Sequence, residues 1–205
     1  MRPDLLPLFP LGVVLFPGVT LPLHIFEERY REMMRVVLAE RIEFGVVLAN
    51  QKGIANCGCT ATVEEILQRY DDGRLDILTV GRRRFEIESI DDELPYLRAR
   101  IEIYDDEDAN LGDPEARAAL VKLAQRIQPD LTLDPFSPRL SFDVARHVED
   151  VEIKQVVLTL RSEADRIEHL TKTLPRTMAA QALTDKMRAL APKNGHSKHL
   201  KTEGD

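Results

Sequence analysis

Few residues have the type and spacing to do chemistry, and two cysteines come first. Cys57 and Cys59 flank Gly58, so their thiols could form a redox pair or supply part of a metal site. A structural zinc site needs four ligands at suitable spacing, and no histidine has such spacing to the cysteines. The histidines are His24, His147, His169, His196 and His199. Because free cysteine is often buried, we predict a structural pair, with no metal and no cofactor.

His24 is the candidate general base. It lies in the run Leu21–Phe26, just before a helical pattern begins. No serine or cysteine in the context of a nucleophile lies near it in the sequence. We therefore favour the alternative, in which His24 caps or orients the corner between a strand and a helix.

The one basic cluster is Arg82, Arg83 and Arg84, which could contact RNA or an acidic partner. Alternation along a strand would point its members to opposite faces, and acidic residues follow closely. This favours an exposed, salt-bridged strand face. The chain also has no glycine-rich run ending in Lys-Ser or Lys-Thr, which excludes nucleotide hydrolysis by that loop. The sequence nominates no active site, and we expect no enzymatic activity.

Composition narrows the class of protein. The 205 residues are 43% hydrophobic and 31% charged, as in a globular protein with a real core, and the formal net charge is -7. That acidic balance disfavours nucleic acid and anionic membranes as partners. No apolar run approaches the roughly 20 residues that cross a bilayer, and the N-terminus has no secretory pattern. Two closely spaced cysteines fit a reducing compartment, so we expect a cytoplasmic protein.

The elements that must position these residues begin with a proline-rich stretch, Leu8–Tyr30. Proline lacks the amide donor of a central strand, so the stretch indicates edge strands and turns, with one turn at Pro17-Gly18. From about Phe26 to about Glu40 the apolar spacing becomes helical. The expected buried face carries Phe26, Tyr30, Met33 and Val37.

The following segments read as β structure. The expected strands are 44–49, 60–69, 74–80, 84–90 and 96–104, with a loop at 51–56. Asp72-Gly73 favours a tight hairpin, and Gly81 is expected to interrupt the return strand. We predict a mostly antiparallel β domain over residues 1–108 with one inserted helix.

The acidic run 105–110 is taken as the boundary to a helical bundle over residues 109–191. Asp113-Pro114 is typical of a helix start. Ser137-Pro138 is expected to cap a helix that carries Leu140, Val144 and Val148. A short helix is expected over 151–160, with Ile153, Val156, Val157 and Leu160 inward. Ser162 is expected to start the last helix, Pro175 to kink or restart it, and residues 192–205 to be a disordered tail.

An ordered series of motifs resembles the Lon N-terminal (substrate-binding) domain family. The segments that carry the resemblance are Leu6–Leu11, Val14–Gly18, Leu21–Tyr30, Phe44–Leu48, Val63–Ile66, Asp72–Leu75, Val80–Ile87, Ile153–Gln155 and Ala164–Ile167. The resemblance covers most of residues 5–175. It implies an α+β fold, a PUA-like β pseudo-barrel followed by a helical bundle. It also implies a stand-alone domain, because the chain ends before an ATPase or a peptidase domain could fit. The family offers no catalytic residues to carry over.

The resemblance implies a non-catalytic module that binds unfolded or flexible polypeptides and holds or delivers them for a protease or a chaperone. Phe16, Leu21 and His24 are candidate peptide contacts, although a core role is favoured for Phe16 and Leu21. Two alternatives stay open. One is an RNA-binding protein with a PUA-like fold, and the other is a hydrolase whose site lies in the cleft between the two halves.

Overall fold

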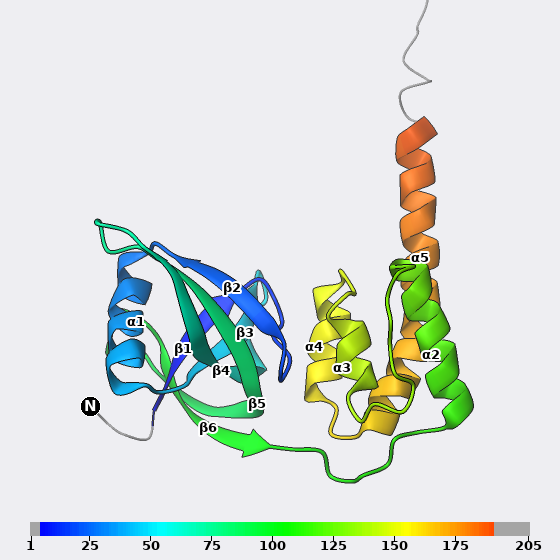
Figure 1. Ribbon diagram of the computed structural model, residues 1–205, viewed down its shortest axis with the longest axis horizontal. Coiled ribbons are helices and arrows are strands. Elements are labelled where there is room, and N and C mark those ends of the chain that lie inside the picture. The colour runs from blue at the N-terminus through cyan, green and yellow to red at the C-terminus, as the bar shows by residue number, and fades with distance from the viewer. Residues whose placement is uncertain (1–4, 191–205) are drawn as a thin grey trace, which may run out of the picture.

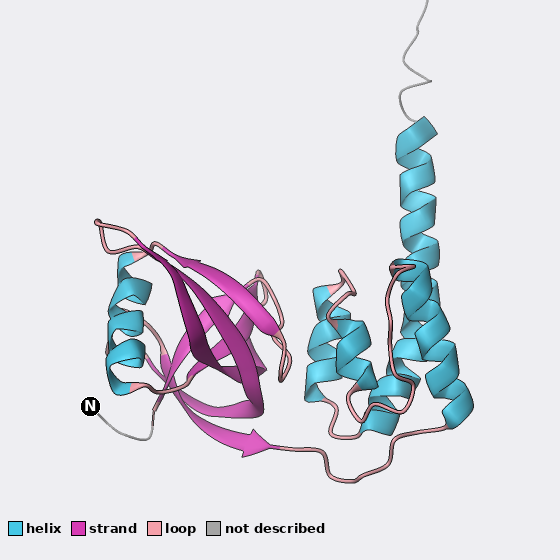
Figure 2. Cartoon of the chain, viewed as in Figure 1, coloured by secondary structure: helices cyan, strands magenta, loops and turns pink. Residues whose placement is uncertain are grey.

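The computed structural model describes residues 5–190, in which six strands and one inserted helix precede four further helices (Figures 1 and 2). The elements are β1 (Leu6–Leu11), β2 (Thr20–Ile25), α1 (Glu28–Glu40), β3 (Phe44–Asn50), β4 (Gly53–Arg69), β5 (Leu75–Asp91), β6 (Arg98–Tyr104), α2 (Pro114–Ile127), α3 (Leu140–Ala145), α4 (Val151–Thr159) and α5 (Glu163–Leu190). The tail expected at 192–205 lies outside the described residues.

The strands form a sheet that closes on itself. Their order is β2-β5-β4-β3-β1-β6, and β5 also pairs with β6, so five strands form a ring and β2 lies outside it on β5. Among the strands of residues 5–190, β1 and β3 pair in parallel and the other pairs are antiparallel. The expected α+β architecture, a mostly antiparallel β pseudo-barrel followed by helices, is confirmed.

β5 closes the ring because it is long enough to serve two neighbours. Leu75–Val80 pairs with β2, whereas Arg84–Asp91 pairs with β6. Gly81 was expected to interrupt this strand, and that prediction is wrong. The strand runs through Gly81, where an added Cβ would lie 2.2 Å from the carbonyl oxygen of Phe16. Glycine is needed here for close backbone approach, not as a strand end.

α1 packs over the part of the sheet formed by β2 and the outer halves of β4 and β5. Its buried residues are Tyr30, Met33, Met34 and Val37, and they share one core with Ile25 and Ile77. The expected start at Phe26 is wrong, because the helix begins at Glu28 and Phe26 is 60% exposed. The loop expected at 51–56 is also too long, since β4 already begins at Gly53.

Local capping chemistry sets two of the helix starts. Asp113 accepts a hydrogen bond from the amide of Ala116 at 2.9 Å, and proline follows in the first turn, as expected for α2. Asp150 caps α4 through the amides of Glu152 and Ile153.

Two details of α3 and α4 differ from expectation. α3 ends at Ala145, short of Val148, and Arg139 stands at its N-cap position instead of Ser137. In α4, Val156 was expected inward but is 40% exposed, and Leu158 is buried in its place. α4 is only nine residues long, so the side of the helix that faces the core determines whether Val156 or Leu158 is buried.

α5 is a single helix that extends well past α2 (Figure 1). It begins at Glu163, directly after Ser162, and buries Ile167, Leu170 and Leu174. The expected restart at Pro175 is wrong, because the helix continues through that exposed proline to Leu190.

Candidate functional site

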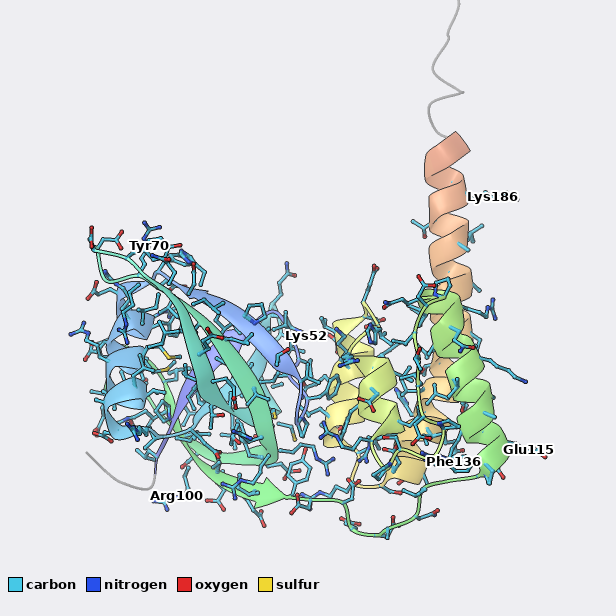
Figure 3. All side chains as sticks on the ribbon, in the orientation of Figure 1. Lys52, Tyr70, Arg100, Glu115, Phe136 and Lys186 are labelled. Carbon is cyan, nitrogen blue, oxygen red and sulfur yellow. The ribbon has the colours of Figure 1, made fainter. Side chains whose placement is uncertain are left out.

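His24 lies in a polar cluster at the end of the barrel that carries the β4–β5 turn; Figure 3 labels its neighbour Tyr70 there. His24 and Asp76 are cross-strand partners in β2 and β5. Nδ1 of His24 lies 2.5 Å from Oδ1 of Asp76, and the Tyr70 hydroxyl donates to Oδ2 of Asp76 at 2.7 Å. The imidazole also stacks on the Phe26 ring at 5.8 Å between centroids.

The two hydrogen bonds to Asp76 shift the pKa of Asp76, and one of them also shifts that of Tyr70. They lower the pKa of Asp76, that from His24 most strongly, so Asp76 is a carboxylate at neutral pH. The same carboxylate raises the pKa of Tyr70 by accepting its hydrogen bond, so the phenol keeps its proton. Asp76 therefore orients both rings.

This arrangement resembles the base and orienting carboxylate of a hydrolase, but it lacks a nucleophile. Within residues 5–190 the side-chain partners of His24 are Asp76, Phe26 and Tyr70, none of them a serine, threonine or cysteine. Nucleophilic catalysis needs such a group within hydrogen-bond reach of the base. The geometry thus favours a histidine held in place over a catalytic one.

A groove with a cavity of about 260 Å³ lies beside this cluster. Its walls come from the end of β1, from β2 and from the start of α1; they are Phe9–Leu11, Pro22–Glu27, Arg29 and Tyr30. Phe26 contributes an exposed aromatic ring at its rim and His24 an exposed imidazole. Such a groove can hold an apolar side chain and offer one polar contact.

The three candidate contacts thus have different environments. His24 lies on the groove. Leu21 is half-buried against the core beneath α1. Phe16 is 1% exposed and stacks on Phe142 of α3 at 5.3 Å between centroids. Phe16 is therefore a core residue, the role that was favoured for it, and it is not available as a surface contact because the helical half covers it.

Sequence reasoning missed three residues of this site: Phe26, Tyr70 and Asp76. Phe26 was expected on the buried face of a helix. The N-cap residue of α1 is Glu27, so Phe26 lies before the helix. Asp76 alternates with buried apolar residues in β5, which was a signal for an outward-facing carboxylate. Nothing in the local sequence shows that His24 is its partner, since 52 residues separate them.

The cysteines do not take part in this site. Burial raises the pKa of the Cys57 thiol and raises that of Cys59 to about 12. Both are free thiols, and Cys57 lies near the helical half, where its carbonyl accepts from Nε2 of Gln155 at 3.1 Å. A buried thiol that keeps its proton is a poor nucleophile and a poor metal ligand.

Among residues 5–190 there is no cluster of three or more histidine, cysteine, aspartate or glutamate side chains that could hold a metal ion. In the same part of the chain, no helix is both long and apolar enough to span a membrane.

The arginine cluster divides between surface and interior. Arg82 pairs with Glu64 at 3.1 Å and Arg83 with Glu43 at 3.8 Å, which is the expected salt-bridged strand face. Arg84 departs from that expectation, because it is 4% exposed and reaches the helical half. It donates to the carbonyl of Leu160 and to Asp106, both at 2.6 Å.

Several contacts bridge the cleft between barrel and bundle, and a cavity of about 160 Å³ remains where the β3–β4 turn faces α4. Besides the Phe16–Phe142 stack, Asp106 bridges Arg84 of β5 and Arg166 of α5, at 2.6 and 2.5 Å. The Tyr104 hydroxyl donates to the carbonyl of Leu158 at 3.0 Å. These contacts leave little room for a hydrolase site between the two halves.

The chain is similar to known proteins in sequence and in fold. The family described as the ATP-dependent protease La (LON) substrate-binding domain matches residues 5–181. A Lon protease of Cytophaga hutchinsonii is 28% identical over 145 residues, which are 67% of this chain. A Lon protease of Roseiflexus castenholzii is 32% identical over 141 residues, or 64% of this chain. In both cases the match covers 18% of the relative's length.

Two solved structures share the fold. A Lon N-terminal domain protein from Xanthomonas campestris superposes with a TM-score of 0.66 at 24% identity, covering 81% of this chain and 96% of its own. The N-terminal domain of a Lon protease from the Mycobacterium avium complex gives a TM-score of 0.60 at 17% identity, covering 83% and 98%. At these identities the likeness is one of fold.

Proposed function

Because the chain belongs to the family of the ATP-dependent protease La (LON) substrate-binding domain, we propose that it is a non-catalytic module that binds unfolded or flexible polypeptides. The observation that carries the proposal is the open apolar groove beside His24, with the Phe26 ring 60% exposed at its rim. Exposed aromatic rings beside an apolar groove are typical of surfaces that bind apolar side chains. Unfolded chains expose such side chains.

A non-catalytic role agrees with the chemistry of the described residues. His24 has an orienting carboxylate but no nucleophile among its partners, and the thiols of Cys57 and Cys59 are held protonated by burial. RNA binding gains no support from the arginine cluster, since Arg82 and Arg83 are ion-paired and Arg84 is buried.

We further propose that a protease or a chaperone takes over the bound polypeptide, and that the protein acts in the cytoplasm. In this proposal the barrel, residues 1–108, carries the binding surface, and the helical part, residues 109–191, supports it. The motivation is the family match together with the position of the groove on the barrel.

The experiment uses the full chain and a labelled polypeptide that is permanently unfolded, such as reduced and carboxymethylated lactalbumin. Fluorescence anisotropy measures its dissociation constant for the wild type and for Phe26→Ala. We expect the variant to bind roughly tenfold more weakly, about 1.4 kcal/mol, as for an aromatic contact residue.

The matched control is Phe136→Ala, which removes another exposed phenylalanine, 77% exposed, from the helical half. It should leave the dissociation constant unchanged. Absence of binding by the wild type at high micromolar concentration would contradict the proposed function. Equal effects of the two variants would remove the groove beside His24 from it.

A further inference from the structure

The outer half of β4 has a neighbour on one side only. β3 pairs with β4 up to Ala61, opposite Phe44, where β3 begins. β5 pairs with β4 on the other side as far as Arg69. Within residues 5–190, therefore, no strand covers the second edge of Thr62–Gln68. Alternate residues of a strand direct their backbone N–H and C=O groups to each side, so backbone groups are left open here, in short runs separated by register shifts between Val63 and Glu65 and between Ile66 and Gln68.

A groove follows this open edge. It encloses a cavity of about 600 Å³ between the C-terminal part of α1 and β4. The lining residues are Val37, Leu38, Arg41, Ile42 and Thr62–Ile66. Figure 1 shows α1 on the side of the barrel away from the helical half, so that half does not cover the groove. The groove thus combines an apolar wall with unpaired backbone groups.

At the opposite edge of this part of the sheet, a proline in β2 disfavours pairing with a further strand. β2 forms that edge, and Val19, just before it, accepts a hydrogen bond from the amide of Gly81 in β5. Alternation from Val19 directs Leu21 toward β5 and Pro22 toward the open side. Proline has no N–H to offer there. The segment Thr62–Gln68 contains no proline, so its edge can still pair.

Charge separates the possible occupants. Glu64 and Glu65 are both exposed on the edge; Glu64 pairs with Arg82, and Glu65 has no ion-pair partner within the described residues. A second copy of the chain, paired edge to edge over this segment, would bring carboxylates opposite carboxylates. Like charges at that distance are destabilising. A basic side chain beside Glu65, on the β4 edge, would instead find a complementary charge, whereas Arg41 places a positive charge at the α1 side of the groove.

We propose that the groove between α1 and the open edge of β4 binds an extended polypeptide segment as an added strand. The segment alternates apolar side chains, which pack on Leu38 and Ile42, with basic side chains near Glu65. Main-chain hydrogen bonds to the edge give affinity, while the groove and the carboxylate select the sequence. This inference rests on the proposed function, adds to the groove beside His24 a second polypeptide-binding surface on the barrel, and names the conformation of the bound segment.

The test uses a short synthetic peptide of alternating valine and lysine, with blocked ends, and the full chain. Two further versions carry N-methyl groups on one or the other alternate set of backbone amides. Strand addition uses only one set, so one methylated version should bind at least tenfold more weakly and the other within about twofold of the parent peptide. The amides of Thr62–Gln68 should exchange more slowly with solvent in the complex.

A charge reversal supplies the second arm. Glu65→Lys should weaken binding of the valine–lysine peptide several-fold and improve binding of a valine–glutamate peptide. Because Glu65 is exposed, the variant should fold normally. Glu88→Lys is the matched control, since Glu88 is also an exposed glutamate but lies on β5, outside the groove; it should change neither affinity.

Each remaining outcome overturns the inference in a recognisable way. If unfolded lactalbumin binds but both methylated peptides bind like the parent, strand addition is wrong and the proposed function stands. If no polypeptide binds, both fall. If the same amides become protected through dimerisation of the protein alone, the occupant is a second copy.

Discussion

At the scale of single residues, Asp106 links the barrel to the helical half. It lies in the acidic run 105–110, which was taken as the boundary to the helical bundle. Its carboxylate joins Arg84 and Arg166, whose side chains are 5% and 1% exposed. Burial alone would raise the pKa of Asp106, but the hydrogen bonds and charges of the two arginines outweigh it and lower the pKa.

Replacement of this carboxylate leaves two buried guanidinium groups short of a partner. We expect Asp106→Ala to lower the free energy of unfolding by roughly 3 kcal/mol, measured by urea denaturation at neutral pH. Asp105→Ala is the matched control, because Asp105 is exposed and its side chain has no hydrogen bond or ion pair with any residue of 5–190; its effect should stay within about 0.5 kcal/mol.

The difference between wild type and Asp106→Ala should depend on pH. A carboxylate whose pKa is lowered by folding stabilises the folded state above its ordinary value, 3.8, and this contribution is lost as pH falls through the folded pKa. The difference should therefore be constant near neutral pH and shrink in acid. A difference that grew on acidification would refute this role.

Buried arginines such as Arg117 and Arg166 could not be foreseen from sequence. Arg117 donates to the carbonyls of Leu111, Pro135 and Ser137. These acceptors lie up to 20 residues away, and the partners of Arg166 reach 60 residues away. Local charge and periodicity carry no information on such partners, so an exposed position was the natural expectation for a guanidinium group.

At the scale of elements, the continuity of β5 depends on Gly81. An alanine methyl there would lie 2.2 Å from the carbonyl oxygen of Phe16, so the loop before β2 would have to move. We expect Gly81→Ala to reduce the free energy of unfolding by about 2–3 kcal/mol. Thermal or urea denaturation followed by circular dichroism measures it.

Gly12→Ala is the companion variant, because a methyl at Gly12 meets no atom within 4 Å. It should change the free energy of unfolding by less than about 0.5 kcal/mol. If the two glycine variants were equally stable, close approach at Gly81 could not be the reason for its glycine.

Elements with a strong local signal were predicted well. Asp113-Pro114 and Asp72-Gly73 each fix backbone geometry within a few residues, so the start of α2 and the β4–β5 turn were expected correctly. Gly81 was misread as a strand break, and Pro175, for which a kink or a restart was expected, does not restart the helix. Their effect depends on what surrounds them: a neighbouring carbonyl for the glycine, and an exposed helix surface for the proline.

At the scale of the whole molecule, a buried residue of the barrel belongs to the core of the helical half. Phe16 comes from the barrel, yet it packs among residues of the helical half, including Phe142 and Leu140. Arg139 adds a hydrogen bond to the carbonyl of Pro17. We therefore expect the two halves to unfold together.

The tyrosines provide a probe for this coupling. The chain has no tryptophan, and its four tyrosines, Tyr30, Tyr70, Tyr96 and Tyr104, all lie in the barrel part. Tyrosine fluorescence thus reports on the barrel, whereas far-ultraviolet circular dichroism reports mainly on the helices. In the wild type both signals should change at one urea concentration.

Phe142→Ala should separate these two transitions. Loss of a buried phenylalanine costs about 3–5 kcal/mol, and here the loss falls on the contact between the halves. The helical signal should disappear at lower urea than the tyrosine signal. Val156→Ala, at a residue 40% exposed on α4, should leave the transitions coincident. Coincident transitions in Phe142→Ala would mean that the coupling lies elsewhere.

The candidate site was only partly predictable from the sequence, because some of its contacts join strands that are distant in the chain. The proline-rich stretch indicated where an edge strand and a histidine would lie. The cross-strand partner of His24 and the open edge of β4, however, depend on strand order and register, and a single sequence does not encode these locally.

The place of Phe16 in the helical core also sets an order of events during synthesis. The barrel is complete once residue 104 has left the ribosome, but the helices that cover Phe16 are made afterwards. At typical rates of translation this gap lasts on the order of several seconds. For that time the nascent barrel presents an uncovered aromatic side chain, so early termination should yield a product that sticks to chaperones.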